Sequence, residues 1–140
     1  MNLQHIRERA PAWYAAAAGG FLFLQGTSTL LFLLFPALDR AFPQLLQATR
    51  MIPIHSTMHI VTGLLALAAL RWGGRAAVWW FALLFGMYYT ALGVVGLVTG
   101  FQFGLGLQPF DHPFHLLAGI PGLIAAALGY HPTQTRGLTT

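Results

Sequence analysis

Four apolar runs fill most of this 140-residue chain, and nearly all ionisable side chains lie in the segments between them. The runs cover about residues 13–35, 54–70, 76–98 and 112–130. A helix needs about 20 predominantly apolar residues to cross a bilayer. Charged residues make up 7% of the chain, too few to cover the surface of a soluble domain, in which they are roughly 25%. The sequence therefore predicts an all-α membrane protein: a single domain, residues 1–140, with four transmembrane helices.

Proline and glycine residues divide the four runs. Pro36 follows the first run and Pro53 opens the second, where a proline suits the first turn because its missing N–H has no helical partner there. Gly73 and Gly74 predict a tight turn between the second and third runs. A glycine-rich loop is expected over residues 99–110, and the polar tail from residue 131 is expected to be loosely ordered.

The placement of the basic residues predicts the orientation of the chain in a bilayer. All seven are arginines, scattered singly, which excludes a nucleic-acid-binding patch. One predicted side holds Arg7, Arg9, Arg71, Arg75 and Arg136, and the other holds Arg40 and Arg50. Cytoplasmic loops carry the excess of positive charge. We therefore expect a multi-pass protein of the bacterial cytoplasmic membrane, in contact with the lipid bilayer, with both termini in the cytoplasm.

Two short segments of the chain match each other. Aligning His59 with His115 also aligns Gly63 with Gly119, and it places His55 opposite Asp111. The apolar runs that precede the two segments have the same predicted direction across the membrane. The chain is therefore interpreted as two parallel-repeat helical hairpins, related by a pseudo-two-fold axis along the membrane normal and forming a four-helix bundle.

These two segments also carry a resemblance to a known family. The first contains His55, His59 and Gly63 at four-residue spacing with Leu64 and Leu67, and the second contains Asp111, His112, His115, Leu116, Gly119 and Leu123. Together they resemble the bacterial four-helix membrane proteins catalogued as domain of unknown function 4383, over about residues 51–128. His112 departs from the pattern, in which an Asn is expected. The resemblance implies a four-span bundle and brings no activity with it.

The paired histidines predict a metal site. His55 and His59 are four residues apart and share a helical face, and His112 and His115 are three apart and do likewise. Facing helices of a bundle commonly supply the ligands of a metal or cofactor site, and imidazole suits Zn, Cu, Fe and Ni. The predicted ligands are thus these four histidines, with Asp111 as a fifth ligand or as an acceptor that fixes a histidine tautomer. Without cysteine, the chain has no thiolate site.

A haem or chlorin is an alternative occupant of the same place. His59 and His115 would then be the axial ligands, and aromatic residues at positions 79–81 and 88–89 would help to wall the pocket. The first run contains a polar patch and the third a short one: Gln25, Thr27, Ser28 and Thr29, then Tyr88, Tyr89 and Thr90. Of these, Ser28, Thr29 and Thr90 approach the depth of His59 and are candidates to orient the ligands. The alternative is that Ser and Thr bond their own helix backbone, as they often do.

Three functions follow from these observations and stay open at the level of the sequence. The first is a binding protein that holds a metal or tetrapyrrole through histidines at the outer ends of the second and fourth helices, as an accessory subunit of a larger membrane complex. The second is a cofactor-free structural or assembly subunit, in which the histidines form hydrogen bonds between helices. The third is a membrane oxidoreductase or transporter, which the three acidic residues of the chain support poorly.

Overall fold

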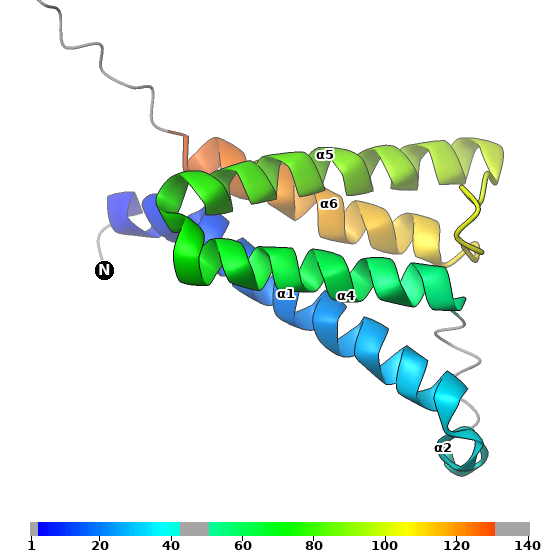
Figure 1. Ribbon diagram of the computed structural model, residues 1–140. Helices are drawn as coiled ribbons and strands as arrows, with labels where there is room; N and C mark the ends of the chain where they lie inside the picture. The colour runs from blue at the N-terminus through cyan, green and yellow to red at the C-terminus, as the bar shows by residue number, and fades with distance from the viewer. Residues whose placement is uncertain (1–2, 43–50, 131–140) are drawn as a thin grey trace, which may run out of the picture.

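The computed structural model describes residues 3–42 and 51–130 (Figure 1). Its elements are α1 (Leu3–Leu34), α2 (Pro36–Ala41), α4 (Pro53–Ala68), the π-helical turn η1 (Ala69–Gly73), α5 (Gly74–Thr99) and α6 (Asp111–Leu128). No strand occurs within these two ranges, so the all-α prediction is confirmed. Helix α1 begins well before the predicted residue 13, because the polar residues ahead of the apolar run include good helix formers.

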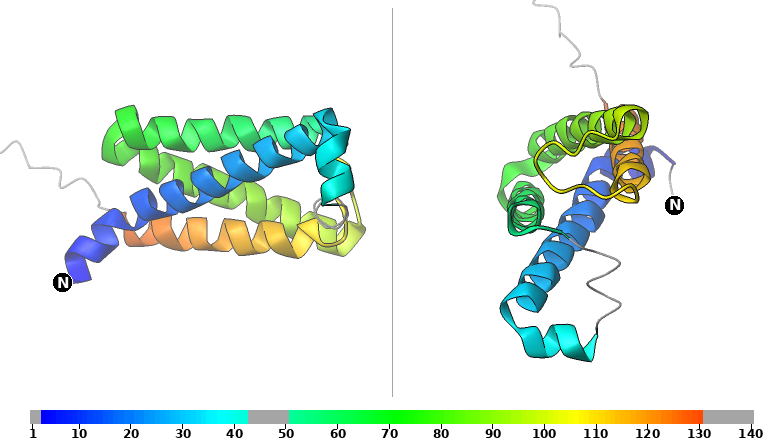
Figure 2. Two further views of the ribbon diagram at one scale, coloured as in Figure 1. Left: turned by 90° about the horizontal axis from the view of Figure 1, so that it is seen from below. Right: turned by 90° about the vertical axis from the view of Figure 1, so that its right-hand side faces the viewer.

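The long helices alternate in direction (Figures 1 and 2). Helices α1 and α5 run from the end that holds the N-terminus toward the opposite end, and α4 and α6 run back. The closest packing is between α1 and α4 and between α5 and α6. The predicted polar tail and the loop position Arg50 lie outside the described residues.

The turn between α4 and α5 differs in form from the sequence prediction. The helical conformation continues through Gly73. The chain widens into the π-helical turn η1 and reverses at Gly74, whose φ of 66° is a left-handed value that glycine adopts without strain. The position of the reversal agrees with the sequence prediction, whereas the helical turn η1 that leads into it does not, because a glycine pair indicates a tight turn and gives no signal for helix.

A glycine contact joins the two helices of the first hairpin. Gly63 of α4 lies directly against the backbone of α1, so that an added Cβ would be 2.7 Å from both the carbonyl oxygen of Gly19 and the amide nitrogen of Phe23. Small residues allow two helix backbones to approach this closely. The contact fixes how far α4 lies along α1.

A second glycine contact joins the helices of the other hairpin. Gly119 of α6 lies against α5, where an added Cβ would be 2.5 Å from the amide nitrogen of Thr90 and 3.0 Å from the carbonyl oxygen of Gly86. Gly63 and Gly119 both lie four residues after a histidine of the matched segments. Their partners are also equivalent, because in each hairpin the contact spans a glycine and the residue four positions after it.

Aromatic packing and one long-range hydrogen bond connect the hairpins. Leu22 of α1 packs with Phe85 and Tyr89 of α5 in the core, and the rings of Phe85 and Tyr89 are stacked with centroids 4.0 Å apart. The hydroxyl of Tyr14 donates to the carbonyl oxygen of Ala118, at 2.6 Å. The core therefore continues along α5 to Tyr89, next to the histidines described below.

Two helical segments are long and apolar enough to cross a membrane, Gln4–Leu34 and Pro53–Thr99. The second contains α4, η1 and α5, so it folds back on itself at Gly74. At the end where this reversal lies, Arg75 forms an ion pair with Glu8 of α1, with 3.7 Å between nitrogen and oxygen. Arginines near the N-terminus and in the α4–α5 turn thus lie at one end of the helices, as the orientation argument requires.

Candidate functional site

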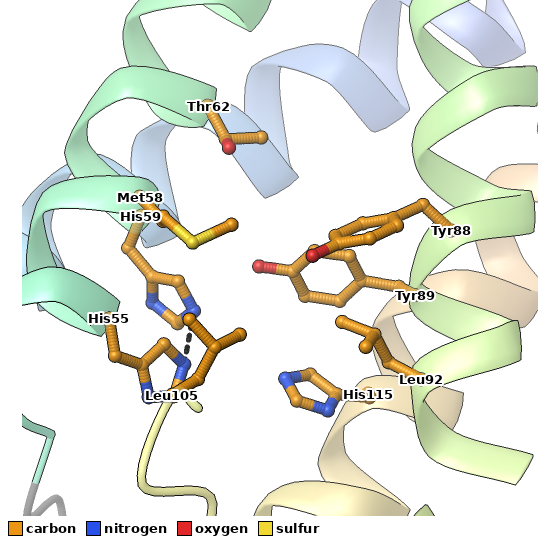
Figure 3. A pocket seen from close by; sticks show the side chains of 9 residues that line it. All are labelled: His55, Met58, His59, Thr62, Tyr88, Tyr89, Leu92, Leu105 and His115. Carbon is orange, nitrogen blue, oxygen red and sulfur yellow. Dashed lines mark hydrogen bonds between the residues drawn. The ribbon is translucent and has the colours of Figure 1, made fainter. Parts of the chain in front are cut away.

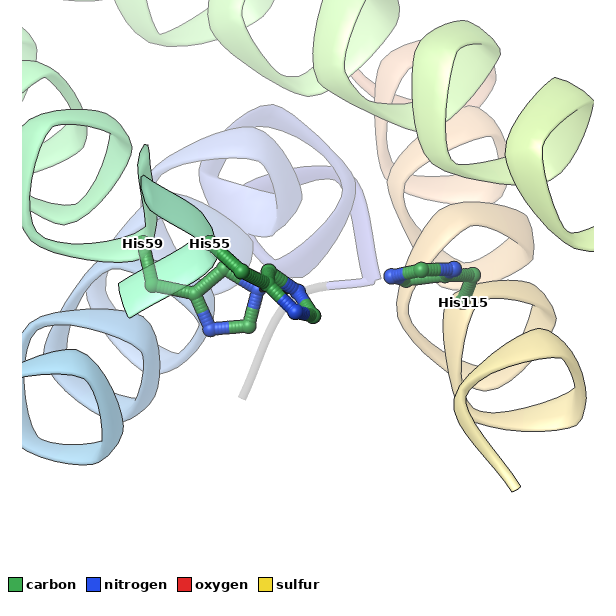
Figure 4. A group of neighbouring side chains, drawn as sticks. All are labelled: His55, His59 and His115. Carbon is green, nitrogen blue, oxygen red and sulfur yellow. Dashed lines mark hydrogen bonds between the residues drawn. The ribbon is translucent and has the colours of Figure 1, made fainter. Parts of the chain in front are cut away.

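Three of the predicted ligands meet between α4 and α6. His55 and His59 lie in the first two turns of α4, which begins at Pro53, and His115 lies in the second turn of α6. Each of these side chains is at most 3% exposed. One ring nitrogen from each of the three lies within 4.8 Å of the others, and a nitrogen of His115 points toward the α4 pair (Figure 4).

The two histidines of α4 are hydrogen-bonded to each other at a separation close to that of two ligands on one ion. Their Nε2 atoms are 3.1 Å apart, and a bound ion would take the place of the shared proton. Two imidazole nitrogens bound tetrahedrally to one zinc-sized ion, at roughly 2.0–2.1 Å each, are about 3.3 Å apart. The ligand nitrogen of His115 lies within 4.8 Å of the other two and therefore has to move inward to complete the set at that bond length. Spacing of four residues along one helix accounts for this geometry.

Gln25 of α1 fixes the tautomer of His59. The Nδ1–H of His59 donates to Oε1 of Gln25 at 3.1 Å. The neutral ring then carries its lone pair on Nε2, which accepts a hydrogen bond from Nε2–H of His55. A hydrogen bond of this kind orients a ligating histidine and raises its basicity. Gly26 permits the approach of the two helices here, since an added Cβ would be 3.0 Å from the Cβ of His59.

Two of the three hydroxyls expected near this depth have another role. Ser28 donates to the carbonyl oxygen of Leu24 at 2.7 Å, and Thr29 donates to that of Gln25 at 3.0 Å. Both therefore bond their own helix, as Ser and Thr commonly do. The hydroxyl of Thr90 is buried and has no hydrogen-bond partner among the described residues.

Among the described residues, no side chain forms a hydrogen bond with Nδ1 of His115 as Gln25 does with Nδ1 of His59. Its ring packs edge-on against Tyr89, with centroids 4.9 Å apart, and its centroid is 6.3 Å from that of His55. The Nδ1 atoms of His115 and His55 are buried without a hydrogen-bond partner in the described part of the chain. Buried polar atoms without partners are rare and call for an explanation. The other ring nitrogen of His55 is hydrogen-bonded to His59, so within the site the Nδ1 atoms of His55 and His115 are the ones left without a partner among the described residues.

The structure does not bring His112 and Asp111 into this group. Positions three apart on a helix diverge by about 60° around its axis, and the buried ring of His112 packs instead against Gly96 of α5. The carboxylate of Asp111 accepts a hydrogen bond from the backbone N–H of Gln108, at 2.6 Å, in the turn that precedes α6. The described site therefore has three histidines rather than four, and Asp111 supports the loop.

A small cavity adjoins the three histidines (Figure 3). Its free volume is about 10 Å³, close to that of one water-sized sphere. The lining residues come from α4, α5, α6 and the loop before α6: His55, Met58, His59, Thr62, Tyr88, Tyr89, Leu92, Leu105 and His115. Sites for cofactor-sized molecules enclose some hundreds of Å³, so this space suits an ion and is too small for a haem or chlorin.

Two residues of this region were not predicted as parts of a site. The sequence pattern places Gln25 only in the polar patch of the first run, and it does not distinguish Met58 from the apolar residues of the second. The sequence feature that could have indicated a role for Gln25 is its amide side chain in an otherwise apolar helix. For Met58, the feature is its position directly before His59, in a helical turn that contains a predicted metal ligand.

No protein-family model, curated protein or solved structure matches the chain.

Proposed function

We propose that this chain is an integral membrane protein that binds one transition-metal ion through His55, His59 and His115. The observation that carries the proposal is the meeting of three buried imidazoles from two helices, with ligand atoms within 4.8 Å of one another. Imidazole is a ligand of Zn, Cu, Fe and Ni. The Gln25 hydrogen bond supports this reading further, because it presents the lone pair of His59 toward the centre of the group.

The outer surface of the helices supports a membrane setting. Large apolar side chains are exposed on the outer faces of all four long helices, for example Leu24 at 65%, Leu65 at 61%, Val98 at 79% and Leu117 at 74%. Lipid or partner helices would remove these side chains from water, which a soluble monomer would leave exposed. We infer that α1, α4, α5 and α6 each cross the bilayer, and that lipid or partner helices cover these faces.

The membrane orientation extends this proposal. With the excess of arginine on the cytoplasmic side, both termini lie in the cytoplasm and the histidine group lies toward the outer surface. The glycine-rich segment from Gly100 to Phe110 then closes the outer end of α5 and α6. Its Leu105 lines the histidine cavity.

We expect single-cysteine labelling to report this orientation, because the native chain has no cysteine of its own. Cysteine introduced at the exposed loop position Gln102 should react in spheroplasts with a membrane-impermeant maleimide. Cysteine introduced at Asn2 should react only after the membrane is permeabilised. The reverse pattern would overturn the orientation, and equal labelling of both sites in sealed spheroplasts would argue against a membrane-spanning arrangement.

We also propose that the two hairpins are a true internal repeat, within the family catalogued as domain of unknown function 4383. The support is that equivalent glycines make equivalent backbone contacts: Gly63 with Gly19, and Gly119 with Gly86. The packing of α1 with α4 and of α5 with α6 gives the same pairing. In this relation His59 and His115 are equivalent ligands.

Metal analysis of the full-length, detergent-purified protein tests the proposed function. We expect about one transition-metal ion per chain, retained from the cell or taken up on titration, and an absorption spectrum from about 350 to 800 nm without a Soret or chlorin band. Protein that neither carries nor takes up Zn(II) or Cu(I) would overturn the metal site and favour a cofactor-free structural subunit. A stoichiometric Soret band would favour a tetrapyrrole instead.

A further inference from the structure

The donor atoms around the histidine cavity are all uncharged. Among the described lining residues, the possible donors are the imidazoles, the thioether of Met58 and the hydroxyls of Thr62, Tyr88 and Tyr89. No carboxylate is among the described lining residues, and that of Asp111 accepts from the backbone N–H of Gln108. Thiolate ligands are excluded, since the chain contains no cysteine. An ion bound here keeps its full charge.

That charge discriminates between ions. The cost of moving an ion from water into a medium of low dielectric constant is large, and in the Born description it rises with the square of the charge. A divalent ion on neutral ligands therefore costs about four times as much to bury as a monovalent ion of the same size. Thiolate ligands offset this cost in many structural Zn(II) sites, and where three imidazoles alone hold Zn(II), a bound water completes the set and offsets the charge by losing a proton. A ligand set made only of neutral protein groups therefore favours a monovalent ion, which needs no such water.

The thioether of Met58 also favours a monovalent ion. Met58 lies next to His59 on α4, and Figure 3 shows its sulfur turned toward the space between α4 and α5, where Tyr88 and Tyr89 lie. Thioether sulfur is a soft ligand that selects Cu(I) among the biological metal ions. The methionine side chain has three rotatable bonds and adapts its reach readily. The same cavity therefore offers three imidazoles and one soft sulfur.

We propose that the ion is Cu(I), held by His55, His59 and His115 with Met58 as the fourth ligand. This inference rests on the proposed function, since it assumes that the three histidines bind a metal. It adds the identity of the ion and one ligand. The role of Met58 follows from its donor chemistry and its place in the cavity. It predicts that the affinity for Cu(I), but not that for Zn(II), depends on Met58.

Parallel titrations of the purified full-length protein with Cu(I) and with Zn(II) test the proposal. Cu(I) affinity is measured anaerobically by competition with a chromophoric chelator, and Zn(II) affinity by competition with a zinc indicator. Loss of a partner outside the coordination sphere already costs about 10–100-fold in metal affinity. We therefore expect Met58→Leu, which removes a ligand, to weaken Cu(I) binding at least tenfold while Zn(II) affinity stays unchanged. Met87→Leu on the exposed side of α5 is the matched control and should change neither.

X-ray absorption of the Cu(I)-loaded protein gives an independent readout. A sulfur neighbour should be present at copper in the native protein and absent in Met58→Leu. If both proteins bind Cu(I) equally and show only nitrogen neighbours, Met58 is not a ligand and that part of the proposal fails, while the three-histidine site stands. If native protein binds neither ion, the proposed function fails as well. A preserved circular dichroism spectrum shows that the leucine variant is folded.

Discussion

Replacing His59 with alanine is expected to abolish metal binding, lowering the affinity by more than about 100-fold relative to native protein. His59 is the ligand that the structure orients best: its Nε2 is 3.1 Å from that of His55, and its Nδ1–H is bonded to Gln25. Without this ring, the two remaining imidazoles are on different helices and the tautomer-fixing bond is lost. The measurement is metal content per chain after gel filtration, followed by titration with Cu(I) and Zn(II).

His112→Ala is the control for this experiment. His112 is also buried, at 5% exposure, and lies one turn before His115 on α6, but its ring packs on Gly96 and not at the histidine group. Its removal should leave the metal content unchanged. A second ligand variant, His115→Ala, should lose the ion as His59→Ala does. Full metal content in both ligand variants, or loss of the ion in His112→Ala alone, would refute the assignment of the site.

The sequence predicted the helical class and part of the site for identifiable reasons. Two histidines four residues apart in one helix must share a face, so the pairing of His55 and His59 follows from helix geometry alone. His115 was reached through its alignment with His59 in the matched segments. Four membrane-spanning helices are a prediction that goes beyond the helical class. Among the described residues, two helical segments have the length and composition of a membrane span, and the second of them contains both α4 and α5.

What the sequence could not supply is the rotation and register of the helices. His112 and His115 look as well paired as His55 and His59, yet α6 is rotated so that His112 faces α5. Gln25 meets His59 because α1 and α4 pack closely at Gly26, a three-dimensional contact that spacing along one helix does not report. The size of the cavity, which separates an ion from a tetrapyrrole, likewise depends on packing.

The glycine contacts lead to the second large effect, on stability. Gly63→Ala is expected to lower the free energy of unfolding by about 1–3 kcal/mol, the usual cost of overpacking a close contact. The new Cβ would be 2.7 Å from the Gly19 oxygen and the Phe23 nitrogen, and both are backbone atoms that cannot rotate away. Helices α1 and α4 must therefore separate. Unfolding of the detergent-solubilised protein by denaturant, followed by circular dichroism, measures the change.

Gly20→Ala separates this packing effect from the general consequences of placing alanine in a helix. Gly20 is also inside α1, but an added Cβ there meets nothing within 4 Å. Alanine is favoured over glycine in helices by up to about 1 kcal/mol, so this variant should be neutral or more stable. Equal destabilisation by Gly20→Ala and Gly63→Ala would contradict the packing argument. Because the same contact sets the position of His59 against Gln25, Gly63→Ala should also weaken metal binding, which Gly20→Ala should leave intact.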